Sequence, residues 1–303
     1  MNPKSTFSVV IPAYNAAETV GDAIASVLSQ TAADFELIVV DDGSTDDTGT
    51  EIERFTDDPR VRHIRQPNAG LAATRNRAVE NARGSYASFL DADDLLLPHY
   101  LEVMGETLDA APQAGFADCD LWILDDETGE VSTSPLGAFE LPADPHELMR
   151  VLLRRNLVRT ASTVRMDVLR RVGYFNTALR ACEDLELWLR ILAHGFAAVR
   201  APDRLLVWRD RRDSMSTQAL LMTSSLCEVY RLVADEYEVP DDIRALAAAR
   251  RRAELKRLAA LTGKRRLAAA LVRIRRAVGR VRWVALRRRK RGVPPELADL
   301  LHR

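Results

Sequence analysis

The chain has 303 residues, of which 47% are hydrophobic and 6% aromatic, and this composition is typical of a globular protein rather than a disordered one. No run of 18 apolar residues occurs, so we expect no helix that spans a membrane. The net charge is −1, but residues 241–303 hold 20 Lys and Arg against 5 Asp and Glu, which predicts an acidic body carrying a basic tail that meets an anionic surface.

The first hundred residues alternate between apolar runs and helical patterns. The runs predict strands at residues 7–11, 35–40, 61–64 and 85–90, and the patterns predict helices at 17–30, after an N-cap at Thr45 or Asp46, and at 70–83. Repeated strand–helix alternation predicts an α/β protein with a mostly parallel, Rossmann-like sheet flanked by helices. In such sheets ligands bind beyond the carboxyl ends of the strands.

The pattern is less regular after Pro98. We expect a helix to about residue 110, a strand at 116–124, a mobile loop over the site at 131–145, helices at 145–155, 166–171 and 183–193, and a last strand at 204–208. From Gln218 the pattern is helical, with a break at Pro240. These signals predict a body at residues 1–217 and a helical, basic C-terminal extension at 218–303.

Two acidic clusters stand where strands end. Asp91 and Asp93, in DADD at 91–94, could share a hard divalent cation such as Mg2+ or Mn2+, or the cluster could only cap the following helix. Asp41, in DDGSTDDT at 41–48, could accept hydrogen bonds from a base or ribose, or it could belong to an ordinary turn and helix cap. Taken singly, each cluster leaves both readings open.

Two helical positions carry further candidates. Asp184 opens the helix at 183–193, where the positive end of the helix keeps a carboxylate ionised and fit to act as a general base; the alternative is a simple first-turn acid. Arg75 could donate to phosphate or could be an exposed helix arginine.

The order and spacing of these motifs resemble the family 2 glycosyltransferases, bacterial enzymes with the fold called GT-A. The resemblance covers about residues 5–217. It is carried by SVVIPAYNAAETV at 8–20, SVLSQT at 26–31, FELIVVDDGSTDDT at 35–48, NAGLAATRNRAVENARGSYASFLDADDLLLP at 68–98 and GYF with EDLELWLR at 173–190.

The resemblance implies a role for each matching residue. Asp184 corresponds to the catalytic base, and Asp93, with Asp91 beside it, to the metal ligand for Mg2+ or Mn2+. The residues implied at the nucleotide-sugar donor are Pro12, Tyr14, Glu18, Asp41, Asp42, Arg75, Asp91, Arg209 and Arg211. The donor half is then about residues 1–98 and the acceptor half about 99–217.

The implied activity is that of a metal-dependent, inverting glycosyltransferase of the hexosyltransferase type. A sugar would pass from a UDP- or dTDP-sugar to the hydroxyl of a glycan or lipid-linked acceptor, in the synthesis of a cell-surface glycan or polysaccharide. The alternatives are a non-catalytic nucleotide-sugar or glycan binder and a sugar nucleotidyltransferase. The second is disfavoured because the loop PAYNAAET lacks the Gly-rich, basic phosphate-binding pattern.

One segment departs from the family pattern. Many relatives have Tyr-Arg at a strand end, with a histidine two residues later that joins the metal. This chain has Trp208 and Arg209, then Arg211 in the place of the histidine. An arginine cannot ligate a cation, but Arg209 or Arg211 could neutralise the departing diphosphate directly.

The basic extension has two interpretations. Apolar residues at spacings of 4, 3, 4 and 3 from Leu267 predict an amphipathic helix, which the basic cluster RRRKR at 287–291 follows. The segment at 264–291 could bind an anionic membrane surface, or it could pack on the acidic body. A 1–240 truncation would separate these readings by liposome binding. No nucleic-acid partner is expected, since no recognised binding module is present.

The cysteine pattern bears on the compartment. Three widely spaced cysteines do not predict a disulfide framework, and the N-terminal apolar run is too short for a signal peptide. We expect buried thiols in a cytoplasmic protein, either free or bound peripherally to the inner face of the membrane.

Overall fold

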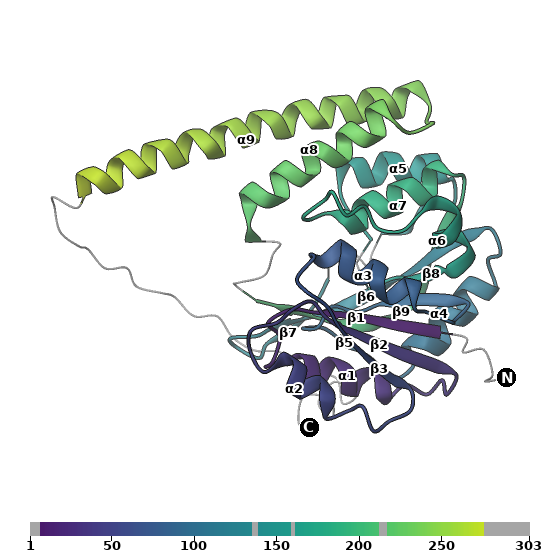
Figure 1. Cartoon of the computed structure of the whole chain (residues 1–303). Coiled ribbons are helices and arrows are strands. Elements are labelled where there is room, and N and C mark those ends of the chain that lie inside the picture. The colour runs from purple at the N-terminus through teal and green to yellow at the C-terminus, as the bar shows by residue number, and fades with distance from the viewer. Residues whose placement is uncertain (1–6, 135–138, 159–160, 212–216, 276–303) are drawn as a thin grey trace.

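The computed structural model describes residues 7–134, 139–158, 161–211 and 217–275, with side chains described as far as residue 263. The elements in chain order are β1 (Phe7–Ala13), α1 (Val20–Leu28), β2 (Phe35–Asp41), α2 (Thr48–Glu53), β3 (Val61–Arg65), α3 (Leu71–Glu80), β4 (Tyr86–Phe89), β5 (Leu95–Leu96), α4 (Tyr100–Asp109), β6 (Ala114–Asp125), β7 (Val131–Thr133), α5 (Pro145–Arg154), β8 (Thr163–Arg165), α6 (Met166–Val172), α7 (Glu183–Ala193), β9 (Ala197–Asp210), α8 (Ala219–Asp235) and α9 (Asp241–Arg275) (Figure 1).

The described strands form one sheet in the order β3-β2-β1-β4-β8-β6-β9-β5, with β7 added at β6. The first four strands are parallel, as the sequence predicts. The second half is mixed, because β8 is antiparallel to both β4 and β6 while β9 is parallel to β6. The chain passes from β1 to β2 on one side and later to β4 on the other. This reversal at β1 creates the crevice in which α/β sheets bind ligands.

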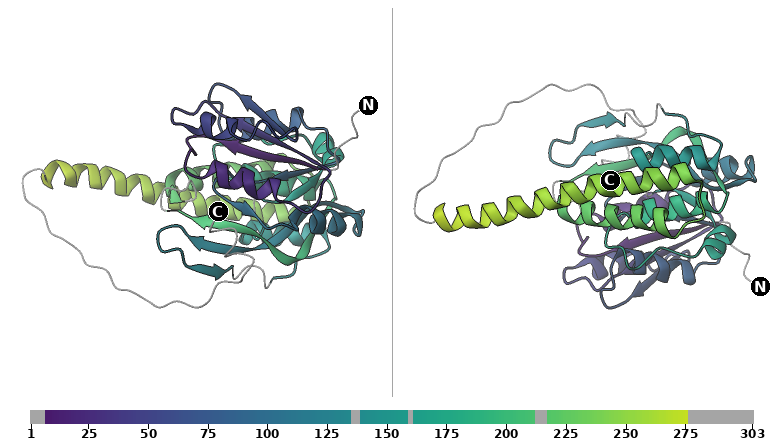
Figure 2. Two further views of the ribbon diagram at one scale, coloured as in Figure 1. Left: turned by 90° about the horizontal axis from the view of Figure 1, so that it is seen from below. Right: turned by 90° about the horizontal axis from the view of Figure 1, so that it is seen from above.

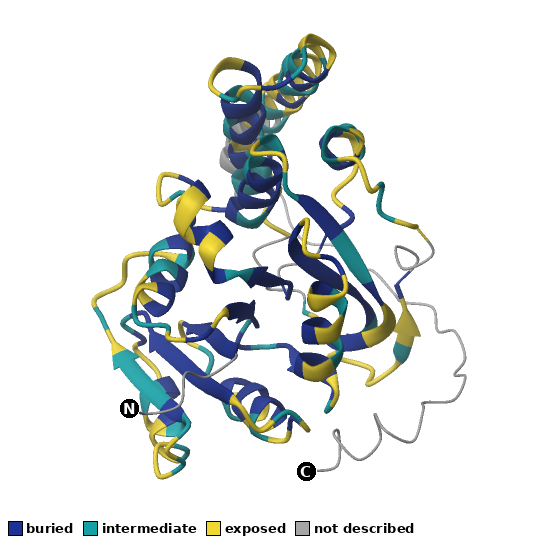
Figure 3. Ribbon diagram, turned by 90° about the vertical axis from the view of Figure 1, so that its right-hand side faces the viewer, coloured by how far each residue is buried: buried dark blue, intermediate teal, exposed yellow. Residues whose placement is uncertain are grey.

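Helices cover both faces of the sheet (Figure 1), and this explains why the first strands are continuous apolar runs. Alternate residues of β1 enter opposite cores. Val10 packs in a cluster that includes residues of α3, α5 and α7, and Val9 packs in one that includes residues of α1 and α4. The central strands are accordingly almost wholly buried (Figure 3).

The first part of the C-terminal extension packs on the body. The break at Pro240 separates α8 from α9, which then runs back along α8 (Figure 1). Val233 of α8 and Ile243 and Ala247 of α9 are fully buried in the same core cluster as α7. An ion pair of 2.6 Å between Arg150 and Asp242 joins α5 to the start of α9.

The far part of α9 projects beyond the body (Figure 2). The side chains of the predicted amphipathic stripe and the basic cluster at 287–291 lie outside the described part of the chain. None of the described helices is long and apolar enough to cross a membrane. The three cysteines are buried and unpaired, as expected.

Three predicted elements differ from the structure. The last strand spans 14 residues rather than 204–208, because its exposed residues 202–204 interrupt the apolar pattern while β6 still pairs with the strand on either side of them. Part of the predicted loop at 131–145 is β7, which forms a hairpin with β6 through a turn where Gly129 has a positive φ of 65°. Helix α2 begins later than predicted, with Asp47 at its N-cap.

Candidate active site at the carboxyl ends of the parallel strands

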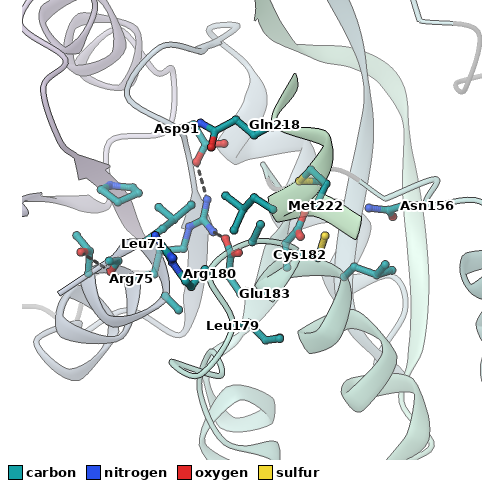
Figure 4. Close-up of a pocket in the computed structure, with 18 of the residues that line it drawn as sticks. Leu71, Arg75, Asp91, Asn156, Leu179, Arg180, Cys182, Glu183, Gln218 and Met222 are labelled. Atoms are coloured by element: carbon teal, nitrogen blue, oxygen red, sulfur yellow. Dashed lines mark hydrogen bonds and ion pairs between the residues drawn. The ribbon is translucent and has the colours of Figure 1, made fainter. Parts of the chain in front are cut away.

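A cleft of about 1180 Å3 opens beyond the carboxyl ends of β1 and β4 and extends to the C-terminal helices. Figure 4 shows part of its lining. The predicted site residues that line this cleft are Pro12, Tyr14, Asp42, Arg75, Asp91, Asp93, Asp184 and Arg211. They come from six separate stretches of sequence, and the fold brings them to one place.

The loop after β1 is fixed to the loop after β2. Asn15, at a positive φ of 49°, donates its N–H to Ser44 Oγ (3.0 Å) and accepts from the N–H of Thr45 through Oδ1 (2.9 Å). Ala16 donates its N–H to Thr48 Oγ1 (2.7 Å). These bonds order one lip of the cleft and leave Tyr14 51% exposed there, an aromatic face available to a flat partner.

Asp41 and Asp42 have separate environments. Asp42 lines the cleft but already accepts from the N–H groups of Ala69 and Gly70 (2.9 Å each) and from Gln66 (2.8 Å). Asp42 thereby fixes the start of α3. Asp41 is 1% exposed and is not in the cleft lining.

Asp41 holds the turn that follows β2. Its Oδ1 accepts from the N–H of Ser44 (2.9 Å), and its Oδ2 lies 3.4 Å from Arg65 Nε. Gly43 inside this turn has a positive φ of 73°, and a Cβ there would lie 2.8 Å from the backbone nitrogen of Asn68. The turn therefore requires glycine.

Arg75 is not a free phosphate-binding arginine. It is 1% exposed and makes ion pairs with Asp91 (2.6 Å) and Glu183 (Figure 4), and its guanidinium lies over the ring of Phe175. Arg75 thus connects the loop after β4 to the start of α7. Burial raises the pKa of Glu183, and the charge of Arg75 opposes that rise.

The carboxylates of the DADD loop lie in different surroundings. Asp91 is bonded to Arg75, and Asp94 is buried and accepts from the N–H of Arg209 (3.0 Å). Among the described residues no side chain is seen to bond to Asp93. Burial together with the charge of Asp91 raises the pKa of Asp93 to about 6, and the charges of Arg211 and Arg209 oppose that rise. A cation at this position would remove that penalty.

The described residues would therefore supply only part of the ligand set of a divalent cation. The described residues contain no group of three or more His, Cys, Asp and Glu side chains that could hold a metal ion. Asp91 and Asp93 could supply carboxylate oxygens, and the remaining ligands would have to come from a bound diphosphate and water, as is common for Mg2+.

Asp184 lies in the first turn of α7 and lines the cleft, half-buried. The N-cap of this helix is Cys182, which has a left-handed φ of 59°. Trp188 is fully buried and stacks on Phe116, and Arg190 donates to the carbonyls of residues 172–174. These contacts fix the helix so that Asp184 is held at the cleft.

Three predicted donor residues do not line the main cleft. Besides Asp41, Glu18 lines a smaller adjoining hollow, which it shares with Arg211. Arg209 forms ion pairs with Asp22 (2.6 Å) and Asp126 (3.6 Å) instead. Sequence reasoning did not single out these partners because they come from helix α1 and the β6–β7 turn.

Sequence reasoning also missed functional candidates. Glu183 adjoins Asp184 in the EDLELWLR motif, but its pairing with Arg75 joins positions 108 residues apart. The cleft is further lined by Arg250, Glu254 and Arg257 of α9. Their 4 and 3 spacing is a helical-face signal that was available in the sequence.

Comparison with known proteins identifies the family of the chain. The sequence model of the family described as "Glycosyl transferase family 2" matches residues 8–166, just over half of the chain. The putative teichuronic acid biosynthesis glycosyltransferase TuaG of Bacillus subtilis is 31% identical over 76% of this chain and 89% of its own length. The chain belongs to glycosyl transferase family 2.

Other curated relatives are much longer proteins. An uncharacterized glycosyltransferase of Rickettsia felis is 30% identical over 61% of this chain and 31% of its own length. A chondroitin synthase of Escherichia coli is 43% identical over 32% of this chain and 14% of its own length. The chain thus spans about a third of the length of the first relatives it matches.

Solved structures show the same fold. TarS of S. aureus (residues 1–349) aligns with a TM-score of 0.64 and 18% identity, covering 81% of this chain and 71% of that one. The mannosyltransferase PcManGT from Pyrobaculum calidifontis, in complex with GDP-Man and Mn2+, aligns with a TM-score of 0.62 and 19% identity over 99% and 80%. The predicted GT-A fold is confirmed.

Proposed function

We propose that this chain transfers a sugar from a nucleotide-sugar donor to an acceptor hydroxyl, with inversion at the anomeric carbon, in glycan or polysaccharide synthesis. One observation carries the proposal. The Asp91–Asp93 loop and the Asp184 helix face the same cleft, and the buried Arg75 connects the two. A site that would neutralise a diphosphate and a general base for a hydroxyl thus lie in one cleft, on two segments that Arg75 joins.

The donor end is the part beyond β1 and β4. Tyr14 and Pro12 would flank the base, and Asp42 would add a polar contact through its remaining lone pairs. Asp93, with Asp91, would hold Mg2+ or Mn2+, which supplies Lewis-acid stabilisation of the departing diphosphate. TarS crystallises with UDP and UDP-GlcNAc, and PcManGT with GDP-Man and Mn2+, which supports a nucleoside diphosphate sugar here.

Asp184 would take the proton from the acceptor hydroxyl as that oxygen attacks the anomeric carbon from the side opposite the nucleotide. A single displacement needs no second carboxylate to form a covalent intermediate, so the configuration inverts. Arg211, which lines the cleft, would add positive charge near the leaving group. Arg209 would contribute through Asp94 and the loop rather than by contact with the donor.

We also propose a boundary for the catalytic unit and a location for the enzyme. Residues 1–217 would form the catalytic unit, with residues 218–303 as an extension whose first part completes the core. The basic segment at 264–291 would bring the enzyme to an anionic membrane surface, where lipid-linked acceptors lie. Sedimentation with anionic liposomes tests this: the full chain should bind and a 1–263 truncation should not, and equal binding would contradict it.

Donor binding is tested with a panel of UDP-, dTDP- and GDP-sugars, each with and without Mn2+, by thermal unfolding. A bound donor raises the melting temperature by mass action, so at least one donor should do so, and more strongly with the cation. No stabilisation by any member of the panel would contradict the proposal. A binder without turnover is disfavoured because Asp91, Asp93 and Asp184 are all present in the cleft.

A further inference from the structure

The inner face of α9 changes character along its length. Ile243 and Ala247 are fully buried in the core. About one, two and three turns further on, Arg250, Glu254 and Arg257 occupy the continuation of the same face and line the cleft. The helix therefore leaves the core and becomes a polar wall of the cleft.

Glu254 is the unusual member of this wall. It is 7% exposed, and its Oε2 has no hydrogen-bond partner among the described residues. It forms an ion pair with Arg257, whose Nη1 lies 3.8 Å from Oε2. A buried carboxylate oxygen without a partner destabilises a fold, and a ligand hydroxyl would supply the missing donor.

Glu254 is close to the catalytic end of α7. Burial raises the pKa of the Cys182 thiol, and the carboxylates of Asp184, Glu183 and Glu254 add to this rise. Cys182 is the N-cap of α7, two residues before Asp184. A ligand on Glu254 would therefore lie on the α9 side of the proposed base, where an acceptor must enter.

The cleft lining also includes apolar and basic residues. Half-buried Leu221, Met222 and Leu226 of α8 form an apolar strip. Besides Arg75 and Arg211, the basic residues of the lining are Arg154, Arg155, Arg180, Arg250 and Arg257. On α9 Glu254 is therefore accompanied by two arginines, Arg250 and Arg257, whereas the loop after β4 contributes Asp91, Asp93 and Asp94.

We infer that α8 and α9 form an acceptor subsite for a saccharide that bears an acidic group, carboxylate or phosphate. Arg257 pairs with the acidic group, Glu254 accepts a hydrogen bond from a sugar hydroxyl, and the α8 strip contacts the apolar face of the saccharide or its aglycone. This inference rests on the proposed glycosyl transfer. Arginine suits the binding of the acidic group because a carboxylate and a phosphate each present two oxygens that one guanidinium can bind together.

Binding of three matched probes tests the inference: phenyl β-D-glucoside, phenyl β-D-glucuronide and phenyl β-D-glucoside 6-phosphate. Their dissociation constants are measured on the full chain saturated with the donor that stabilises it most. The glucuronide or the phosphate should bind about tenfold tighter than the neutral glucoside, the effect expected of one charge-assisted contact. The tighter of the two identifies the acidic group.

Two variants assign the contacts. Arg257→Gln should remove most of the preference for the charged probe and leave the affinity for the neutral one unchanged. Arg252→Gln is the matched control, because Arg252 is exposed on the same helix outside the cleft lining, and it should keep the preference. Glu254→Leu should weaken the binding of all three probes and raise the melting temperature of the free protein, since it removes a buried carboxylate oxygen to which no described group donates a hydrogen bond.

Equal affinity for the three probes, or no detectable binding of either charged probe, would overturn the inference. So would an equal loss of preference in Arg252→Gln and Arg257→Gln. A protein that binds no nucleotide-sugar would instead overturn the proposed function, so the two failures are distinguishable.

Discussion

Asp91, Asp93 and Asp94 follow one another within four residues, yet each has a different role in the structure. Asp91 bonds to Arg75, Asp94 accepts from the backbone of Arg209, and Asp93 lines the cleft with a raised pKa. The sequence predicts that these carboxylates meet at a strand end. Their separation into different roles depends on Arg75 and Arg209, whose contacts follow from the tertiary structure.

Asp184→Asn should lower turnover by roughly 10²- to 10⁴-fold, because the amide cannot accept the acceptor proton. Donor binding should be retained, since Asp184 is proposed to act on the acceptor. Single-turnover transfer together with donor titration measures both quantities. A nearly unchanged rate would remove Asp184 from the mechanism.

The raised pKa of Asp93 predicts a pH dependence of cation binding. With a pKa of about 6, the carboxyl becomes protonated as the pH falls through 6, and a proton then competes with the cation. The affinity of the free protein for Mn2+ should therefore decrease below pH 6 and be nearly constant above pH 7. Titration of Mn2+ at several pH values tests this. The variant Asp93→Asn should lose the pH dependence of Mn2+ affinity. The same pH dependence in that variant would mean that a group other than Asp93 causes it.

At the scale of elements, buried ion pairs fix the site by joining segments that are distant in sequence. Arg75 of α3 holds the loop after β4 and the start of α7 together, and Asp42 holds the start of α3. The sequence predicts α3 and α7 as elements because both carry apolar periodicity. It does not predict their ion pair, since periodicity identifies buried faces and not the partner of one buried arginine.

Arg75→Gln should destabilise the protein by about 3 kcal/mol or more, because it leaves Glu183 buried without its counter-charge. It should also reduce transfer by displacing the Asp91 loop. Arg77→Gln, at an exposed position of the same helix, is the control. Urea unfolding of both variants makes the comparison, and similar free energies of unfolding would contradict the role given to Arg75.

At the scale of the whole molecule, the sequence predicts the parallel half of the sheet well and the second half poorly. Continuous apolar runs identify β1, β2 and β4 because both faces of these strands are covered. The long β9 is predicted short because its residues 202–204 are exposed while the backbone stays in the sheet. Likewise, the charge asymmetry predicts a basic extension but does not show that its first turns complete the core.

The packing of α9 predicts where the extension can be cut. A chain that ends at residue 263 keeps Ile243 and Ala247 in the core and should melt close to the full chain. A chain that ends at residue 240 loses both, and burial of an isoleucine alone contributes about 1.5–3 kcal/mol, so it should melt at a lower temperature. Calorimetry of the three chains decides this. Equal melting of the 240- and 263-residue chains would mean that α9 adds nothing to the core.

The most direct measurement of the central claim is release of nucleoside diphosphate from the stabilising donor, with and without acceptor, in Mn2+ and in excess EDTA. We predict release in Mn2+ that is faster with acceptor, falls strongly in EDTA and is lost in Asp93→Asn. Binding of the donor without any release would contradict glycosyl transfer and favour a binding protein. Full activity in EDTA would contradict the metal site at Asp91 and Asp93.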